Sequence, residues 1–400
     1  MTYRELLERL FAARRFGMKL GLARMRELLD KLGAPDQRLG TVVHIGGTNG
    51  KGSTVAMVAA LARAGGAHVA TYTSPHLSSL RERIVIDGEL ASEQAIVEAA
   101  ARVEAVGGSE LTFFEQITAI AMSLIAERRV DVSVLEVGLG GRLDATNVVA
   151  APIAAVTGVA FDHEAILGNT LSAIAFEKAG IFKSGQSAFI GGAGEPEGVP
   201  LLVEHARRAG VAKLTVVVDE VAVALPGAHQ RRNAALAVAL ADELGIACDR
   251  DAVLASVKHP GRFEVADDLI LDGAHNPNGA RALSATLRER GITPVLVIAV
   301  SADKDVGAIA DALAPAVRAV VATRYQQERA LAPALLADAF RGKVDIVETA
   351  PDLATALARA RELGAPVLIA GSLFLVGEAR VLCLDAVSDP MFVTDPSLPP

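Results

Sequence analysis

Residues 41–64, TVVHIGGTNGKGSTVAMVAALARA, decide the fold. The first five of them, Thr41–Ile45, are mostly β-branched and predict a buried strand, and Gly52–Ala64 predict a helix. Between the two, glycines allow backbone N–H groups to surround phosphate oxygens, Lys51 can neutralise phosphate charge, and the Ser53 hydroxyl can bind Mg²⁺. The helix N-terminus adds the positive end of its dipole. This stretch therefore predicts a phosphate-binding loop in an α/β fold.

The loop departs from the common GxxxxGK[ST] pattern at two positions. Ile45 stands where the first glycine of that pattern lies, and Gly52 separates Lys51 from Ser53. The interpretation therefore depends on the order of strand, glycine-rich turn, lysine, hydroxyl and helix. The alternative is a simple turn capped by Ser53, but four glycines and a lysine favour the phosphate loop.

Composition excludes several classes of protein. The 400 residues carry 39 basic and 47 acidic side chains, a net charge of -8, which disfavours a general binder of nucleic acids or anionic membranes. The two cysteines, Cys248 and Cys383, cannot build a disulfide framework, and no Cys/His motif indicates zinc. The N-terminal sequence lacks a signal-peptide core, and the longest uncharged run, residues 145–161, is too short to cross a membrane. We expect a soluble cytoplasmic protein.

Short β-branched runs alternate with Ala- and Leu-rich helical stretches on the C-terminal side of the loop. Further strands are predicted at His68–Tyr72, Asp131–Val137, Ile153–Thr157, Ser187–Ile190 and Lys213–Val218. Further helices are predicted at Glu115–Glu127, Ser172–Ile181 and Gln230–Leu244. This alternation indicates βαβ units and a mostly parallel sheet.

A second series begins near Leu269 and predicts a smaller α/β unit. Its strands are predicted at Leu269–Leu271, Val295–Val300, Ala319–Ala322, Asp345–Val347 and Val367–Ala370, and its helices at Asn278–Arg290, Val306–Leu313, Ala332–Phe340 and Asp352–Leu363. The sequence Pro260-Gly261-Arg262 marks the boundary, because Pro and Gly interrupt regular structure. We expect an N-terminal domain over residues 1–265, a C-terminal domain over residues 266–400, and a loose tail over the last dozen residues.

Polar side chains follow three of the predicted parallel strands. Ser74, Glu136 and His163 each lie at or just beyond the carboxyl end of a different strand. Open α/β sheets bind ligands at that edge, so the three side chains are expected to converge on Mg²⁺ held by phosphates. Lys178 lies on a predicted helix, where a lysine by itself indicates a solvated face.

The C-terminal unit carries similar polar clusters. Asp272 and His275 follow its first strand, Ser301 follows its second, and Arg262 at the boundary adds a fixed cation. An Asn-Pro pair at residues 276–277 is a good helix cap. A cap does not explain Asp272 and His275 together, so a binding role is the second interpretation.

Twelve segments, in this order, resemble the folylpolyglutamate synthase/dihydrofolate synthase family, a branch of the Mur ligase superfamily. They are GTNGKGS (47–53), TSPHL (73–77), RERI (81–84), TFFE (112–115), EVGLGGRLDATN (136–147), DH…LG.T (162–170), EKAGI (177–181), HQ..NA (229–234), GRFE (261–264), LDGAHNP (271–277), SADKD (301–305) and GSLFLVGE (371–378). Each segment alone is weak, but together they cover nearly the whole chain and are highly specific.

The resemblance implies a P-loop ATPase domain of the Mur ligase type with a mostly parallel sheet and a folate site, followed by a smaller Rossmann-like glutamate ligase domain. It implies an ATP- and Mg²⁺-dependent amide ligase that activates dihydropteroate or folate as an acyl phosphate and transfers it to L-glutamate. Two Mg²⁺ sites are expected, and a monovalent cation is left open. Such enzymes are usually monomeric, so we expect a monomer with no nucleic-acid or membrane partner.

The resemblance also assigns roles to the matching positions of this sequence. Nucleotide contacts are expected from Gly47, Thr48, Asn49, Gly50, Lys51, Gly52, Ser53, Asn233, Arg262, Asp272 and His275. Substrate contacts are expected from Thr112, Phe114, Glu115, Arg142, Asp144, Ala145 and Ser301. Phe114 is expected to stack on the pterin ring, and Asp144 to accept hydrogen bonds from its N–H groups.

The metal ligands implied by the resemblance are Ser53, Ser74, Glu136, His163 and Lys178. Lys178 matches a lysine that the family carries as a carbamate, which replaces the solvated-face interpretation. A carbamate forms only from a neutral amine, so the site must lower the pKa of Lys178. Lys51, Lys178 and His163 are the expected catalytic residues.

Two other functions share parts of this pattern. One is a Mur-type ligase that acts on a peptidoglycan precursor, which the GKGS and LDATN segments disfavour. The other is a non-catalytic ATP-binding switch, which has no need of Lys51, Glu136, His163 and Lys178 together. An acceptor with a pterin ring is favoured, and activity on both dihydropteroate and folate is the leading hypothesis.

Overall fold

The computed structural model describes residues 1–13 and 21–391, and these form two compact units. Of the described residues, the first unit contains 1–13, 21–224, 232–257 and 389–391, and the second contains 225–231 and 258–388. The chain therefore returns to the first unit at its C-terminal end. The predicted boundary at residue 265 lies within a strand of the second unit and stays a prediction about the domains.

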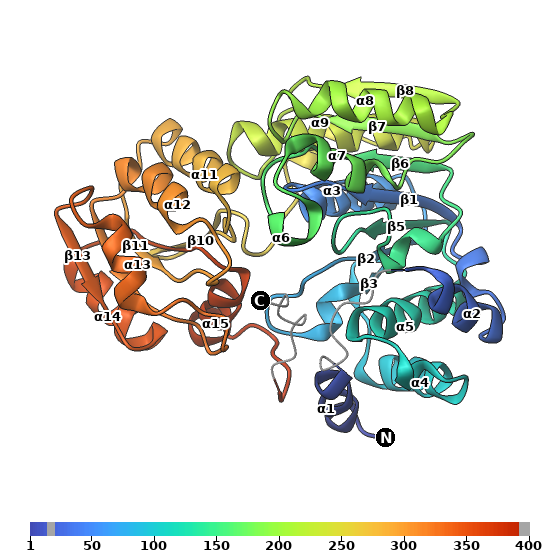
Figure 1. The fold of residues 1–400 in the computed structure, drawn as a ribbon, viewed down its shortest axis with the longest axis horizontal. Helices are drawn as coiled ribbons and strands as arrows, with labels where there is room; N and C mark the ends of the chain where they lie inside the picture. The colour runs from blue at the N-terminus through green and yellow to red at the C-terminus, as the bar shows by residue number, and fades with distance from the viewer. Residues whose placement is uncertain (14–20, 392–400) are drawn as a thin grey trace. The chain divides into compact units, whose positions relative to one another are not determined.

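Eight strands form the sheet of the first unit, in the order β4-β3-β2-β5-β1-β6-β7-β8 (Figure 1). They are β1 (Thr41–Gly46), β2 (Val69–Tyr72), β3 (Ile84–Ile86), β4 (Glu89–Leu90), β5 (Val132–Glu136), β6 (Ile153–Val156), β7 (Ser187–Gly191) and β8 (Lys213–Val217). Neighbouring strands from β2 to β8 pair in parallel, whereas β3 and β4 run antiparallel. The segments that follow β1, β2, β5 and β6 therefore meet at one edge of the sheet.

Helices cover this sheet and bury its apolar side chains. They are α1 (Tyr3–Ala13), α2 (Ala23–Lys31), α3 (Lys51–Ala64), α4 (Glu93–Ala105), α5 (Phe113–Arg128), α6 (Glu164–Leu167), α7 (Leu171–Ala179), α8 (Gly198–Ala209), α10 (Arg250–Leu254) and most of α9 (Ala228–Glu243). Helices α1, α2, α4 and α5 share one hydrophobic core with β1, β2 and β5, and α7 and α8 share another with β6 and β7. Helix α3 packs on β1, β2 and β5, directly after the phosphate loop.

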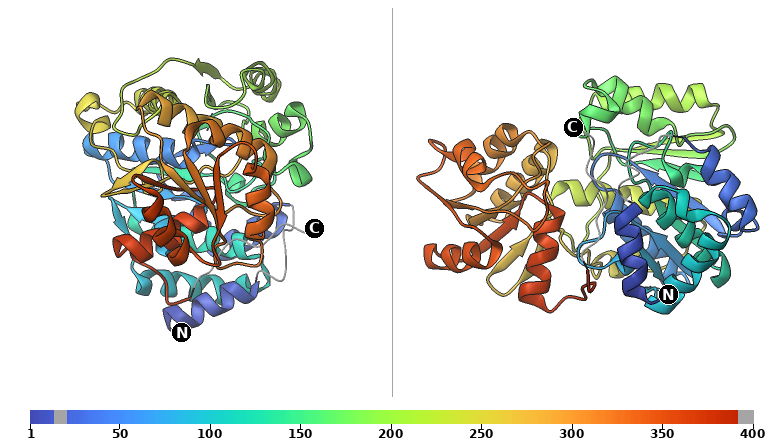
Figure 2. Two further views of the ribbon diagram at one scale, coloured as in Figure 1. Left: turned by 90° about the vertical axis from the view of Figure 1, so that its left-hand side faces the viewer. Right: turned by 60° about the horizontal axis from the view of Figure 1, so that its bottom comes forward.

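The second unit has a six-stranded sheet in the order β13-β12-β11-β14-β10-β9. Its strands are β9 (Glu264–Ala266), β10 (Leu269–Leu271), β11 (Val295–Ile298), β12 (Ala319–Ala322), β13 (Ile346–Thr349) and β14 (Val367–Ala370), all parallel except β9. Helices α11 (Pro277–Glu289), α12 (Val306–Leu313) and α13 (Pro333–Phe340) bury one face of it. Helices α14 (Leu353–Leu363) and α15 (Leu373–Leu384) pack on the same strands from the other side (Figure 2).

The predicted fold class, α/β with mostly parallel sheets in two units, is confirmed. Every predicted strand and helix is present, with ends that differ by one or two residues because element termini lack a strong sequence signal. No helix in residues 1–13 and 21–391 is both long and apolar enough to cross a membrane. The predicted loose tail lies largely in residues 392–400, outside the described part of the chain.

Candidate functional site

The phosphate loop joins β1 to α3 and needs glycine at two places. Gly47 has a φ of 137°, and a Cβ there would collide with the Thr157 hydroxyl. Gly50 has a φ of 86° and is the N-cap of α3, and a Cβ there would lie 2.5 Å from Asn233 Oδ1. Asn233, a predicted nucleotide contact on α9, therefore packs directly on the loop. Only a residue without a side chain fits at either glycine.

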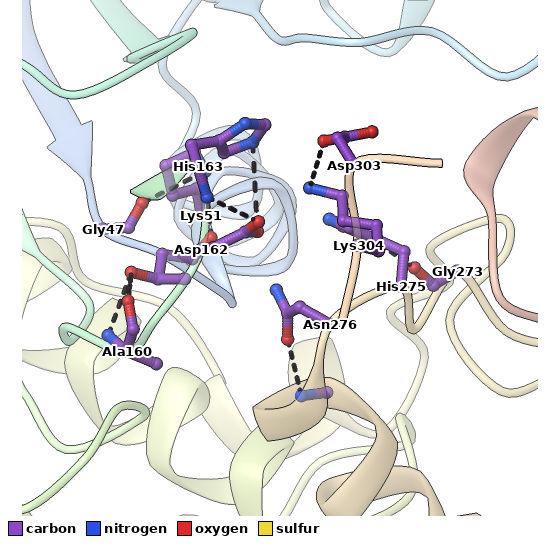
Figure 3. Close-up of polar contacts among 12 residues, drawn as sticks. Gly47, Lys51, Ala160, Asp162, His163, Gly273, His275, Asn276, Asp303 and Lys304 are labelled. Atoms are coloured by element: carbon purple, nitrogen blue, oxygen red, sulfur yellow. Dashed lines mark hydrogen bonds and ion pairs between the residues drawn. The ribbon is translucent and has the colours of Figure 1, made fainter. Parts of the chain in front are cut away.

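The segment after β6 fixes the backbone of this loop. The Thr157 hydroxyl donates a hydrogen bond of 2.6 Å to the carbonyl of Asn49. Thr48 Oγ1 donates to the carbonyl of Ala160 at 3.1 Å and accepts from its N–H at 3.0 Å (Figure 3). Neither Thr157 nor Ala160 is among the site residues predicted from the sequence. Their place directly after a parallel strand is the signal that could have found them.

Two lysines meet at one carbonyl oxygen of the loop. Lys51 Nζ donates to the carbonyls of Gly47 and Thr48, both at 3.2 Å, and Lys178 Nζ donates to Gly47 at 3.1 Å. Lys178 is only 4% exposed, so it does not lie on the solvated face that a helical lysine suggests. Burial, followed by the nearby Lys51 charge, lowers the pKa of Lys178 to about 7. A large neutral fraction of this amine therefore exists at neutral pH.

Ser53, Ser74 and Glu136 supply oxygen atoms of the kind that bind Mg²⁺. All three are buried, and the Ser74 N–H donates to Glu136 Oε2 at 3.2 Å. Glu136 Oε1 also lies 4.0 Å from Lys51 Nζ. Among the described residues the buried Ser74 hydroxyl has no hydrogen-bond partner, and a bound cation would satisfy it. The Ser74 and Glu136 oxygens therefore fit the hard cation that the sequence predicts.

Asp162 and His163 follow β6 and lie beside each other. The His163 N–H donates to Asp162 Oδ1 at 2.9 Å, and His163 Nε2 lies 3.9 Å from Asp162 Oδ2 (Figure 3). His163 has a φ of 53° at the N-cap of α6. In the described part of the chain, no cluster of three or more His, Cys, Asp or Glu side chains forms a metal site by itself. A cation here would depend on serine hydroxyls and on ligand phosphates as well.

Thr112 and Glu115 form a capping box at the start of α5. The Thr112 Oγ1 and N–H both donate to Glu115 Oε2, at 2.7 and 2.9 Å, and the Glu115 N–H donates to Thr112 Oγ1 at 3.3 Å. Arg24 Nη2 from α2 pairs with the same carboxylate at 3.0 Å. Both predicted substrate contacts are therefore engaged in holding the helix N-terminus.

Phe114 follows this cap and lies partly exposed beside a glycine. Its ring packs on Gly138, where a Cβ would collide with the ring. The Phe114 and Tyr72 ring centroids lie 6.4 Å apart, and the Tyr72 hydroxyl is within 3.0 Å of Thr118 Oγ1. The position of Phe114 is thus set by its neighbours, while part of its ring remains accessible.

Asp144 ends a buried chain of hydrogen bonds that begins on β1. Its Oδ1 accepts from the Thr146 N–H at 3.0 Å and from Thr146 Oγ1 at 2.5 Å, and its Oδ2 accepts from the Leu139 N–H at 2.9 Å. His44 Nε2 lies 2.8 Å from Thr146 Oγ1. Because the Thr146 proton goes to Asp144, His44 must donate through Nε2–H. Burial raises the pKa of Asp144 and lowers that of His44 to about 3, so His44 is neutral.

Arg142 and Ala145 complete the predicted substrate set in this unit. Arg142 donates to Glu177 Oε1 through Nε and Nη2, at 3.2 and 2.8 Å, and its guanidinium lies 5.2 Å from the centroid of the Phe176 ring. Ala145 is buried at the start of the short helix that follows Asp144. Arg142 is therefore already paired with Glu177, the residue that precedes Lys178 in the sequence.

In the second unit, Asp272 joins β10 to the segment before β9. Its Oδ2 accepts from the Phe263 N–H and its Oδ1 from the Ala274 N–H, both at 2.9 Å. His275 Nδ1 lies 2.8 Å from the Gly273 carbonyl (Figure 3), and a Cβ at Gly273 would collide with the Arg262 guanidinium. The predicted nucleotide contacts Arg262, Asp272 and His275 thus lie together at one end of β10.

Ser301 lies after β11 in a second polar group. Its hydroxyl is buried 2.7 Å from the Tyr325 hydroxyl. Asp303 lies 3.5 Å from Lys304 Nζ and 3.8 Å from Arg329 Nη2. Two cations thus share one carboxylate, which leaves net positive charge for an anionic group.

Comparison with known proteins gives the same family as the motifs. Residues 45–195 match the Mur ligase middle domain, and residues 261–373 match the Mur ligase glutamate ligase domain. A dihydrofolate synthase/folylpolyglutamate synthase of Mycobacterium tuberculosis is 35% identical over 90% of this chain and 89% of its own length. The chain belongs to the folylpolyglutamate synthase/dihydrofolate synthase family. The predicted Mur ligase fold is therefore confirmed.

Other members of the folylpolyglutamate synthase/dihydrofolate synthase family are similar to nearly the whole chain. A probable bifunctional folylpolyglutamate synthase/dihydropteroate synthase of Haloferax volcanii is 36% identical over 97% of this chain. The chain spans only about half of that relative, 51% of its length. Escherichia coli FolC in complex with DHPP and ADP superposes with a TM-score of 0.87 at 30% identity, covering 96% of this chain and 98% of its own. A bifunctional folylpolyglutamate synthase/dihydrofolate synthase with Mn, AMPPNP and L-glutamate bound has a TM-score of 0.80 at 29% identity, covering 92% of this chain and 95% of its own.

Proposed function

We propose that the chain is an ATP- and Mg²⁺-dependent ligase that joins L-glutamate to dihydropteroate, to folates, or to both. The observation that carries this proposal is the burial of Lys178 beneath the phosphate loop, at the same carbonyl as Lys51. A switch that only binds ATP does not need a second, buried lysine there. DHPP and ADP are bound in the E. coli relative, and AMPPNP and L-glutamate in the bifunctional synthase structure, which supports the substrate class.

The proposed reaction has two steps. A carboxylate oxygen of the acceptor attacks the γ-phosphorus of ATP, the bond to ADP breaks, and an acyl phosphate forms. The amine of L-glutamate then attacks the acyl carbon, and the tetrahedral intermediate collapses with loss of phosphate and of an amine proton. Lys51 and the backbone N–H groups of residues 47–53 would hold and neutralise the phosphates. The remaining nucleotide contacts would come from Asn233, Arg262, Asp272 and His275.

The divalent cation would be held by Ser53, Ser74, Glu136, His163 and Lys178, two ions being expected. When bound, Mg²⁺ supplies positive charge that offsets charge on the phosphate oxygens. The neutral amine of Lys178 can add to carbon dioxide, and loss of a proton then leaves a carbamate anion where a cation stood. A monovalent cation stays an open prediction, as does a monomeric state.

The acceptor site would lie along residues 112–115 and 144–146. The accessible part of the Phe114 ring would stack on the pterin. Asp144 already accepts three hydrogen bonds on its two oxygens and interacts with the Gly138 N–H as well, so a ligand N–H would share one of these acceptor oxygens. Thr112, Glu115 and Arg142 are bonded to other groups, so we propose that they act mainly by holding this site in shape.

The test is a product assay with the purified full chain. With ATP, Mg²⁺, L-glutamate and either dihydropteroate or tetrahydrofolate, one ADP and one phosphate should form for each glutamate conjugate. Omission of the acceptor or of glutamate should abolish the conjugate. Absence of turnover with both acceptors contradicts the proposal, and turnover with a UDP-linked acceptor instead would assign the chain to peptidoglycan precursors.

A further inference from the structure

The C-terminal segment after α15 returns to the first unit, where it places a half-buried carboxylate, that of Asp389. The Asp389 N–H donates to the carbonyl of Ser78 at 3.1 Å, and Met391 packs against the core of that unit. The Asp389 carboxylate accepts hydrogen bonds from the Ser79 hydroxyl at 2.6 Å, from the Leu80 N–H at 2.7 Å and from the Tyr3 hydroxyl at 3.0 Å. Three donors from two distant parts of the chain thus converge on one side chain.

These contacts lie in the loop that carries Ser74. The RER motif, residues 81–83, folds back on this loop, and the Glu82 carboxylate accepts from the N–H groups of Leu77, Ser78 and Ser79 at 2.8 to 2.9 Å. Asp389 takes the next N–H in the series, that of Leu80. Two carboxylates therefore hold four consecutive backbone N–H groups.

No residue between Ser74 and Ser79 belongs to a helix or strand, so the contacts with Glu82 and Asp389 help to define the path of this loop. Ser79 and Leu80 are buried. Loss of Asp389 would remove the acceptor of both donors, which would then have to bond to water or to other groups, and this favours a different loop conformation. At the other end of the loop, the Ser74 N–H bonds to Glu136, and the Ser74 hydroxyl lacks a partner within residues 1–13 and 21–391.

We infer that Asp389 is a positioning residue for the metal site: it fixes the loop that presents the Ser74 hydroxyl beside Glu136. This inference rests on the proposed function for the identity of the ligand, a divalent cation held together with a nucleotide. Asp389 itself touches no ligand and acts through Ser79 and Leu80. The end of the chain thereby contributes to a site whose sequence motifs all lie before residue 379.

Two variants of the full chain test the inference, Asp389→Asn and Asp389→Ala. A matched control is Asp385→Asn, which removes the same charge from an exposed position in the same segment. Tyr3→Phe removes only one of the three bonds to Asp389 and leaves its contacts with Ser79 and Leu80. The first measurement is amide hydrogen exchange across residues 77–80, and the second is Mn²⁺ binding in the presence of a non-hydrolysable ATP analogue.

Asp389→Ala is expected to speed exchange across residues 77–80 and to weaken Mn²⁺ binding about tenfold, with Asp389→Asn intermediate and Asp385→Asn unchanged. Tyr3→Phe should have a smaller effect in the same direction. Unchanged Mn²⁺ binding in the folded Asp389 variants overturns the inference, even if exchange is faster. If Asp389→Ala fails to fold, Asp389→Asn and Tyr3→Phe decide by the same criterion. Neither measurement uses an acceptor substrate. A failed ligase assay would therefore contradict the proposed function without changing the outcome of the exchange and Mn²⁺-binding measurements.

Discussion

The phosphate loop and the predicted acceptor segments belong to the same unit but use their polar groups in opposite ways. At the loop, Lys51 and Lys178 donate to neutral carbonyl oxygens, and the Ser74 hydroxyl has no partner in the part of the chain that the structure describes. In the acceptor segments, the carboxylates of Glu115 and Asp144 are already occupied by several donors. The first region thus offers positive charge to an anionic ligand. In the second, the polar groups are already hydrogen-bonded to one another, and they hold the Phe114 ring and a few carboxylate oxygens in place for the acceptor.

The strongest test of this contrast is Lys178→Ala. Turnover should fall about a hundredfold or more, because a group proposed to hold the divalent cation beside the phosphates is lost. Binding of a non-hydrolysable ATP analogue should change little, since Lys51 and the glycine-rich backbone remain. Lys213→Ala, at an exposed lysine paired with Glu243, is the control and should leave both quantities unchanged. Equal loss of turnover and binding would contradict the role of Lys178.

The lowered pKa of Lys178 leads us to expect that the ligase activity depends on pH. Burial lowers the pKa of Lys178 to about 7, so the amine becomes neutral as pH rises through that value. Because only the neutral amine adds carbon dioxide, activity and its stimulation by bicarbonate should both increase from pH 6 to pH 8. Carbon-13 NMR of the chain in labelled bicarbonate should show a carbamate signal that is absent in Lys178→Ala. No signal at pH 8 would remove the carbamate from the account.

A second test changes the shape of the phosphate loop alone. Gly50→Ala should weaken nucleotide binding about tenfold, because the new Cβ meets Asn233 and the backbone φ is 86°. Gly66→Ala is a close control: its φ is 88°, but no atom lies within 4 Å of the added Cβ. Calorimetric titration with ADP should separate the two. Similar losses in both variants would attribute the effect to backbone strain and not to the contact with Asn233.

The acceptor segments should respond more weakly. His44→Leu removes the Nε2–H donor to Thr146 and frees the Thr146 hydroxyl to turn away from Asp144. Loss of one neutral hydrogen bond predicts an increase of about fivefold in the KM for the pterin acceptor, with the KM for ATP unchanged. His68→Leu, at an exposed histidine of the same unit, should alter neither KM. An increase in the KM for ATP alone would separate His44 from the acceptor site.

The smallest expected effect is that of salt. The chain is acidic overall, with a net charge of -8, so its anionic ligands are recruited by local cations and bound Mg²⁺. At saturating Mg²⁺, kcat/KM should change by less than about threefold between 0.05 and 0.3 M KCl, because short-range contacts are screened less than a long-range field. A steep salt dependence would contradict recruitment by local charge.

The sequence was a good guide to the central elements and a poor one to their distant contacts. Strands β1, β10, β12 and β14 agree closely with prediction, because buried parallel strands have continuous apolar runs with clear ends. The short antiparallel strands β3, β4 and β9 were not predicted, since two or three residues show no periodicity. Helix α4 is also absent from the prediction, although its apolar face and its Ser92 N-cap are sequence features that indicate a helix.

In the site, too, local neighbours could be predicted from the sequence and distant contacts could not. The adjacency of Ser74 and Glu136 could be predicted because both follow neighbouring parallel strands. The contacts of Arg24 with Glu115, His44 with Thr146 and Asp389 with Ser79 join residues 91 to 310 positions apart in the chain. Nothing in the local pattern of a single sequence specifies such partners. The cytoplasmic location and the domain boundary at residue 265 stay predictions.

The most direct test of the central claim follows an oxygen atom through the reaction. The acceptor is prepared with oxygen-18 in the carboxylate that receives glutamate, and the phosphate released by the full chain is analysed by mass spectrometry. Activation as an acyl phosphate predicts one labelled oxygen in each phosphate, formed together with the glutamate conjugate. Conjugate formation with unlabelled phosphate, or phosphate release without conjugate, would contradict the account.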